Sequence, residues 1–382
     1  VDEMIIDFIW SQRKPKIKRD VIIQNIENGG IKVPSFKLMV EANRLAWIKR
    51  ILDDSYSKWK CIFKELIKPL SPIHFTECHL EDNMIDNLQI PFYQQVFNLW
   101  NKSRSKPDGK NEILEQIIWH NKYINLPQAP KSKKVRYLSW PALYKHGIVK
   151  IKDLYDKDFN QINVSSYCSK YGIKANFIKV SQIFKGIPKE WKKVITDTQI
   201  KYNEDTDINF TIHADSKTCN ILKGKSKLIY EILCIKSYVR PTALNRWLEF
   251  FDIDENDWQP IFYQPYTCCR ETRLQSFQYK FIHRIISCNK WLYNQKIVDS
   301  PECVLCNENK VDDILHRFTE CLNVKQFWIS LENWWNSVSD CKVLLSPKHI
   351  IFGLYYDNKY FVQINYVLIL AKWYIQEQIR TE

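Results

Sequence analysis

Glycine and proline are scarce in this sequence, and their scarcity narrows the fold class. The chain has 382 residues, of which 8 are glycine and 15 are proline. An all-β protein with many tight turns would need more of these turn-forming residues. Long stretches instead repeat apolar residues at helical spacing; in residues 36–52 they form one side of an amphipathic helix, with lysine and arginine on the other. The sequence therefore predicts a mainly α fold of multi-helix domains.

The sequence also lacks a long hydrophobic run and a recognisable signal peptide. The longest apolar run near the C-terminus, residues 366–371, falls far short of the roughly 20 residues that a membrane-spanning helix needs. The 12 cysteines are scattered instead of grouped as a disulfide framework, which suits a reducing compartment. We therefore expect no membrane partner. Because the chain begins with valine, we expect it to be a piece of a longer protein.

No complete enzyme motif is present either. The chain has no GxxxxGK[ST] phosphate loop, no GxSxG elbow and no HExxH pair. Polymerisation by two metal ions needs clustered carboxylates, and the two Asp-Asp pairs do not supply them. Residues 53–54 follow a basic amphipathic helix, and residues 312–313 fall inside a cluster of cysteine and histidine. We predict no catalysis within this chain.

Positive charge exceeds negative charge. Lysine and arginine number 56 and the acids 43, which gives a net charge of +13. Such an excess favours a polyanionic partner through phosphate contacts, and nucleic acid is the first hypothesis. Two segments are the candidates for this contact: residues 11–19, and residues 270–296, where basic and aromatic side chains are interleaved. The alternative for the second segment is a solvated face over a core stripe.

These two segments supply the candidate phosphate contacts. A helix drawn over residues 272–286 puts Arg273, Lys280 and Arg284 on one side and apolar residues on another. Such a helix could meet phosphates with its basic side while its apolar side packs. The side chains that we predict to bind nucleic acid are Arg13, Lys14, Lys16, Lys18, Arg19, Arg273, Lys280, Arg284 and Lys290.

Near the C-terminus, cysteines and a histidine have the spacing of a metal site. Cys303, Cys306, His316 and Cys321 read as C-x2-C-x9-H-x4-C. A C-x2-C turn lets two thiolates converge on one ion, and the histidine and last cysteine can complete a tetrahedron. We predict a small, structural zinc element. A reduced cysteine pair beside a buried histidine is one alternative, and a weaker ligand set of Cys268, Cys269, His283 and Cys288 is another.

Several motifs follow one another along the chain. They are FIWSQRKPKIKRDVIIQNIENGGIKVPSFKLMVEANRLAWI at residues 8–48, YKHGIVKIKDLYD at 144–156, IPKEWK at 187–192, and CVLC with HRFTEC within 303–321. In this order they resemble the C-terminal part of the second open reading frame protein of L1-type non-LTR retrotransposons. The first motif is similar to the segment that follows the polymerase palm, around the thumb.

The resemblance implies a function. In that family the full protein is an endonuclease and reverse transcriptase, and both enzymatic parts lie upstream of these motifs. For this chain the resemblance therefore implies three parts. They are a distal thumb (residues 1–60), a helical connecting region (61–215) and a cysteine-rich RNA-binding domain (216–382). A polar, turn-rich stretch at residues 196–216 favours the second boundary.

The resemblance also implies partners and a place in the cell. The expected partners are template RNA, target DNA and the upstream polymerase chain, in a cytoplasmic ribonucleoprotein and in the nucleus. The four cysteine and histidine residues match the zinc-like pattern of that family. The alternative function is a decayed or host-adopted remnant that serves as a protein-interaction scaffold.

Overall fold

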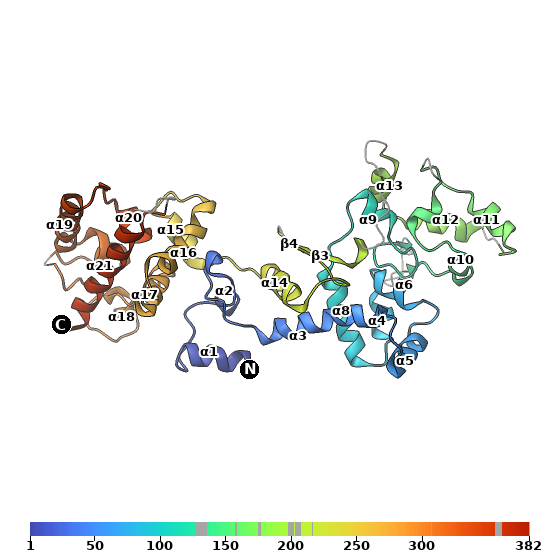
Figure 1. Cartoon of the computed structure of the whole chain (residues 1–382), viewed down its shortest axis with the longest axis horizontal. Coiled ribbons are helices and arrows are strands. Elements are labelled where there is room, and N and C mark those ends of the chain that lie inside the picture. Colours follow the sequence, from blue (N-terminus) through green and yellow to red (C-terminus); the bar gives the residue numbers. More distant parts are fainter. Residues whose placement is uncertain are drawn as a thin grey trace. The chain divides into compact units, whose positions relative to one another are not determined.

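The chain is mainly helical, as the sequence predicts, in the computed structural model shown in Figure 1. The structure describes residues 1–126, 136–156, 159–174, 177–197, 202, 208–215, 217–306, 308–355 and 361–381. Within this described part the strands form two short antiparallel pairs, β1–β2 and β3–β4. None of the described helices combines the length and the apolar character that crossing a membrane requires.

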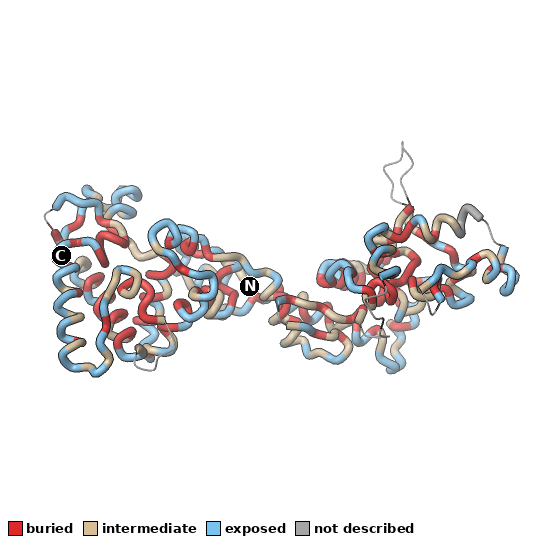
Figure 2. The backbone as a smooth tube through the Cα atoms, turned by 90° about the horizontal axis from the view of Figure 1, so that it is seen from above, coloured by how far each residue is buried: buried red, intermediate tan, exposed pale blue. Residues whose placement is uncertain are grey.

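Contacts divide the chain into two compact units. The first unit comprises residues 1–35 and 237–382, and the second comprises residues 36–236. In both units buried and exposed residues alternate along most helices, as Figure 2 shows in red and blue. The units do not follow the order of the three predicted segments, because residues 1–35 pack with the C-terminal part of the chain. Much of the predicted boundary at residues 196–216 lies outside the described residues.

The first unit is built from helices around an aromatic core. Its core includes Trp247, Phe281, Phe318 and Phe352, all at most 1% exposed. Its helical elements are α1 (Asp2–Ile9), α2 (Arg19–Ile22), η1 (Ile26–Asn28), α15 (Thr242–Leu248), η4 (Glu255–Asp257), α16 (Trp258–Cys268), α17 (Thr272–Ile282), α18 (Asn289–Asn294), η5 (His316–Glu320), α19 (Leu322–Val338), α20 (Pro347–Phe352) and α21 (Phe361–Thr381).

A close contact attaches the N-terminal segment to this core. Gly29 ends η1 with a φ of +81°, and a Cβ there would lie 2.9 Å from the ring of Phe262 in α16. The Nε2–H of buried His283 donates to the carbonyl of Gly29 at 2.9 Å. Burial lowers the pKa of His283 to about 4, so the ring is neutral at pH 7. Residues 1–35 therefore belong to the first unit.

The second unit contains shorter helices and both strand pairs. Its strands are β1 (Asn125–Leu126), β2 (Arg136–Tyr137), β3 (Thr211–Ala214) and β4 (Lys217–Asn220). Its helical elements are α3 (Phe36–Leu45), α4 (Trp47–Leu52), α5 (Lys58–Leu66), α6 (Pro72–Glu77), α7 (Asp82–Asp86), α8 (Pro91–Ser103), α9 (Lys110–Leu114), α10 (Pro141–Lys145), η2 (Ile151–Leu154), α11 (Val164–Lys170), α12 (Phe177–Gly186), α13 (Lys189–Thr196), η3 (Ile208–Phe210) and α14 (Ser226–Lys236).

The helix predicted at residues 36–52 is divided in two. α3 ends at Leu45 and α4 starts at Trp47, with Ala46 between them. The predicted apolar side is nevertheless buried, since Leu38, Leu45 and Ile48 are at most 8% exposed. α3 packs against α8 and α14 of the same unit, and α4 packs against α6. Phe36, Met39 and Val40, on the other side of α3, are exposed.

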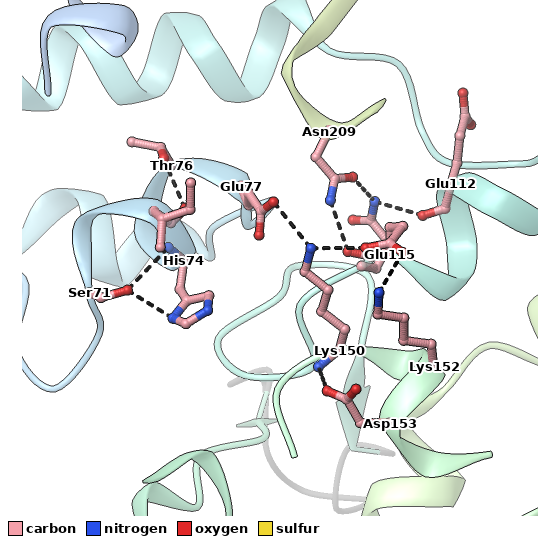
Figure 3. A network of polar contacts seen from close by, with 12 residues as sticks. Ser71, His74, Thr76, Glu77, Glu112, Glu115, Lys150, Lys152, Asp153 and Asn209 are labelled. Carbon is pink, nitrogen blue, oxygen red and sulfur yellow. Dashed lines mark hydrogen bonds and ion pairs between the residues drawn. The ribbon is translucent and has the colours of Figure 1, made fainter. Parts of the chain in front are cut away.

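A buried polar network joins distant segments of the second unit (Figure 3). The carboxylate of Glu115, which is fully buried, accepts hydrogen bonds from Lys150 and Lys152 at 2.9 Å each and from the hydroxyl of Tyr202. Lys150 also binds Glu77 at 3.1 Å. Burial by itself would raise the pKa of Glu115, but the hydrogen bonds from Tyr202, Lys150 and Lys152 outweigh it and lower the pKa.

We predict that Glu115→Gln destabilises the second unit by about 3 kcal/mol, because it removes the buried carboxylate that accepts hydrogen bonds from Lys150, Lys152 and Tyr202. The folded pKa of Glu115 is lowered, so its contribution is present above the pKa of an unfolded glutamate and is lost as pH falls through the folded value. Urea unfolding followed by hydrogen exchange of second-unit peptides measures the loss. Glu65→Gln, in the exposed pair with Lys68, is the control and should cost less than about 1 kcal/mol. Equal costs for both variants would contradict the assignment.

Candidate functional site

The four residues with metal-ligand spacing come together in the first unit. The ligand atoms of Cys303, Cys306, His316 and Cys321 all lie within 4.8 Å of one another. Cys306 Sγ lies 3.4 Å from His316 Nε2. The four side chains are at most 8% exposed. This Cys3His group could hold a metal ion.

The local backbone explains how the four ligands converge. The two first cysteines lie on a turn that is closed by backbone bonds, from Cys303 N–H to Lys310 O at 2.9 Å and from Asp312 N–H to Pro301 O at 2.8 Å. His316 begins η5, a π-helical turn, which is a rare element that is often found at functional sites. Cys321 follows that turn and caps α19, and its N–H donates to His316 O at 2.8 Å.

The chemistry of the group suits a cation. Burial raises the pKa of the Cys303 thiol to about 12, and the neighbouring Cys321 and Cys306 add to this. A bound metal ion would reverse this preference, since thiolate is the form that binds metal. Three cysteines and one histidine fill a tetrahedron and leave no open position, so such a site is structural.

The weaker alternative ligand set is not assembled. Among the described residues, Cys303, Cys306, His316 and Cys321 are the one group of three or more cysteine, histidine or acidic side chains whose ligand atoms meet. His283 Nε2 forms a hydrogen bond with the carbonyl of Gly29 instead of facing the cysteines as a ligand. Cys268 and Cys269 lie close to each other, with their sulfur atoms 3.7 Å apart.

A buried ion pair that the sequence analysis missed supports the Cys3His group. Asp312 and Arg317 are each 1% exposed, and Arg317 Nε lies 2.9 Å from Asp312 Oδ1. Arg317 Nη1 donates to Ser287 O at 2.9 Å and to Gln376 Oε1 in α21 at 3.1 Å. Asp312 Oδ2 accepts from Asn289 N–H, at the start of α18, at 2.7 Å. The pair thus connects the turn that follows Cys303 and Cys306 to α18 and α21.

A basic groove is the second candidate site. It has a volume of about 930 Å³ and lies within the first unit, between the N-terminal segment, α17 and α21. Its lining includes five of the nine cationic side chains that the sequence analysis selected. They are Arg13, Lys14, Lys16, Arg273 and Lys280. Two segments about 260 residues apart therefore contribute to one surface.

The groove carries a strong excess of positive charge. In the described part of its lining, Glu377 is the one carboxylate beside the five cations. Burial lowers the pKa of Lys16, and the nearby charges of Lys280 and Arg13 lower it further. Like charges held this close favour an anionic ligand, since binding removes their mutual repulsion.

Aromatic rings lie beside these cations. The guanidinium of Arg273 lies 5.8 Å from the ring centroid of Trp373, which also lines the groove. The Nζ of Lys16 lies 4.3 Å from the ring centroid of Trp291. The interleaving of basic and aromatic residues in the sequence thus takes the form of direct contacts in the structure.

The other selected cations lie elsewhere. Lys18 and Arg19 line a smaller pocket of about 320 Å³ that shares Lys16 with the groove, and Arg19 pairs with Asp2. The Nζ of Lys290 lies 3.6 Å from Asp313. None of these three side chains is among the groove-lining residues.

The helix predicted over residues 272–286 is shorter than expected, and the position of Arg284 is therefore wrong in that prediction. α17 ends at Ile282, and Arg284 adopts a left-handed conformation with a φ of +55°. Its guanidinium lies 4.3 Å from the ring centroid of Trp247, a core residue. Arg284 therefore does not share a face with Arg273 and Lys280, because the chain leaves the helix before reaching it.

We predict that the protein binds one thiophilic divalent ion per chain and that Cys303→Ser/Cys306→Ser abolishes this binding. Loss of two ligands should also increase hydrogen exchange in residues 300–325, because metal binding contributes to local folding. Metal content and the visible spectrum of the Co²⁺-loaded protein measure the first effect. Cys341→Ser, outside the group, is the control. A variant that retained the ion would show that the ligands are not these cysteines.

Comparisons with known proteins add no assignment. No protein-family model matches the chain, and no curated protein matches it. The function is therefore argued from the Cys3His group, the buried ion pair beside it and the basic groove.

Proposed function

We propose that this chain binds nucleic acid and carries out no catalysis of its own. In this proposal it is the C-terminal segment of a non-LTR retrotransposon reverse transcriptase and holds template RNA or target DNA for an upstream polymerase. The single observation that carries the proposal is the basic groove of the first unit. The endonuclease and the polymerase would belong to the preceding part of the parent protein, and the complex would act in a cytoplasmic ribonucleoprotein and in the nucleus.

The placement of the charges in the groove favours a polyanionic ligand over a small anion. Arg273 and Lys280 are seven residues apart on α17, so they lie on one side of that helix two turns from each other. Lys16, which lies near the other end of the sequence, lines the same groove. Charges spread along a groove match successive phosphates, and each neutralised phosphate releases counterions.

Zinc is the metal that the Cys3His group suits best. Zinc has the tetrahedral preference and the affinity for thiolate and imidazole that such a group offers. Its contribution would be to hold the turn that carries Asp312 and Arg317. Arg317 binds Ser287 and Gln376, and both of these residues line the groove. We propose that the metal thereby orders one wall of the groove.

A protein-interaction scaffold is the second candidate function. Exposed apolar side chains on α19 favour it, since Ile329 is 53% exposed, Trp334 51% and Val338 64%. Trp328 and Trp335, on the other side of the same helix, are buried. Capture of protein partners after nuclease treatment, with no affinity of the chain for nucleic acid, would favour this function.

We predict that Arg273→Ala/Lys280→Ala weakens binding of a structured RNA and flattens its salt dependence. Loss of two phosphate contacts should reduce the slope of log K against log salt concentration by about 1.4 to 1.8. Fluorescence anisotropy at several salt concentrations measures the slope. Lys64→Ala/Lys325→Ala removes the same charge from exposed positions outside the groove and should leave the slope unchanged. The groove is not the binding surface if both double variants behave alike.

We predict a separate effect for Asp312→Asn. This variant keeps all four ligands, so metal content should stay at one ion per chain. It weakens the buried pair with Arg317, which holds Ser287 and Gln376 at the groove, so RNA affinity should fall. Asp340→Asn, at an exposed position, is the control for the change in charge. Unchanged RNA affinity in a metal-loaded Asp312→Asn protein would disprove the coupling between the Cys3His group and the groove.

A further inference from the structure

Trp291 is one of the exposed tryptophans of this chain. It lies on α18, a six-residue helix with no buried residues, and 42% of its surface is exposed. Trp100, Trp119 and Trp247, by contrast, are at most 2% exposed. The indole of Trp291 therefore contributes little to the core.

The neighbour of Trp291 connects it to the groove. The Nζ of Lys16 lies 4.3 Å from the centroid of the indole ring, and Lys16 also lines the groove. Lys280 and Arg13 act on Lys16 with like charge. Lys16 is thus held between repulsion from other cations and attraction by the ring, which is worth only about 0.5–1 kcal/mol at an exposed site. A phosphate in the groove would compete readily for this ammonium group.

We propose that Trp291 is a stacking platform for an unpaired base beside the groove, next to Lys16. When a strand binds, Lys16 moves from the ring to a phosphate, and the uncovered indole face stacks on the base attached to a neighbouring phosphate. The ligand class is single-stranded RNA or DNA, because the bases of a duplex are already stacked and paired. This inference rests on the proposed function of the groove.

Neighbouring aromatic residues do not offer the same arrangement. Trp373 lines the groove and faces Arg273, but it is partly buried and packs against the core of the first unit. Tyr293 is exposed on α18, two residues after Trp291, a spacing that puts the two rings on different sides of a helix. Trp291 is the ring that combines exposure with a cation from the groove.

The test compares Trp291→Leu and Trp291→Phe with the unaltered chain. The probes are a labelled single-stranded RNA, the single-stranded DNA of the same sequence, and the blunt DNA duplex. Trp291→Leu should lose from about fivefold to about a hundredfold in affinity for a single strand, the range expected for one stacked base. Its salt slope should be unchanged, and its affinity for the duplex should not fall. Trp291→Phe should retain most of the affinity for a single strand that Trp291→Leu loses, because phenylalanine keeps an aromatic ring at this position.

Two further arms separate stacking from a general loss of structure. An oligonucleotide with abasic positions should bind the unaltered chain weakly, because it has no base to stack at those positions. It should bind Trp291→Leu with the same weak affinity. Lys16→Met should flatten the salt slope by about 0.7, the effect of one phosphate contact on a single strand. Adding Trp291→Leu to Lys16→Met should still lower the affinity for a single strand. Metal content and circular dichroism of each variant report whether the first unit is folded.

The outcomes distinguish this inference from the proposed function. Salt-dependent binding by the unaltered chain, with Trp291→Leu unchanged toward single strands, would overturn the stacking platform and leave the groove standing. Equal losses for single strands and duplex would also overturn it. Absence of salt-dependent binding by the unaltered chain would overturn both proposals. A loss confined to oligonucleotides that carry unpaired bases would support Trp291 as the platform.

Discussion

The arrangement of the first unit depends on the buried ion pair between Asp312 and Arg317. Removing two charges from water costs several kcal/mol per ion, and good geometry with further hydrogen bonds must offset that cost. Both Asp312 oxygens are bonded, and Arg317 also binds Ser287 O and Gln376 Oε1. These bonds fix the turn of the Cys3His group relative to α18 and α21. A purely apolar contact would specify that arrangement less strictly, since it is not directional.

The groove shows the opposite electrostatic situation. The cations that line it lie beside aromatic rings and one carboxylate. Burial lowers the pKa of Lys16, and two neighbouring cations lower it further. Such a surface costs free energy in the unbound protein through repulsion, and a polyanion recovers that free energy on binding. The first unit therefore combines a neutralised interior around the Cys3His group with a surface on which positive charge exceeds negative charge. We interpret the interior as structural and the surface as the binding site.

The sequence predicts features that depend on local spacing. The helical class and the meeting of Cys303 with Cys306, His316 and Cys321 follow from periodicity and ligand spacing. The groove could not be assembled from sequence, because the contact that attaches its N-terminal part joins His283 to Gly29 across 254 residues. The end of α17 was missed for a related reason. Arg284 leaves the helix and packs on Trp247, a tertiary contact that overrides helical periodicity.

The two Asp-Asp pairs illustrate why the proposal assigns no catalysis to this chain. Hydrogen bonds from Lys60 and Ser55 lower the pKa of Asp53 to about 2, so this carboxylate is ionised and engaged in the turn after α4. Asp312 forms an ion pair with Arg317, and Asp313 accepts a hydrogen bond from His316 N–H at 3.0 Å. A two-metal site needs carboxylates that converge on solvent-accessible ions. These three carboxylates instead bind backbone groups and cations of the chain itself, so they do not converge on a two-metal site.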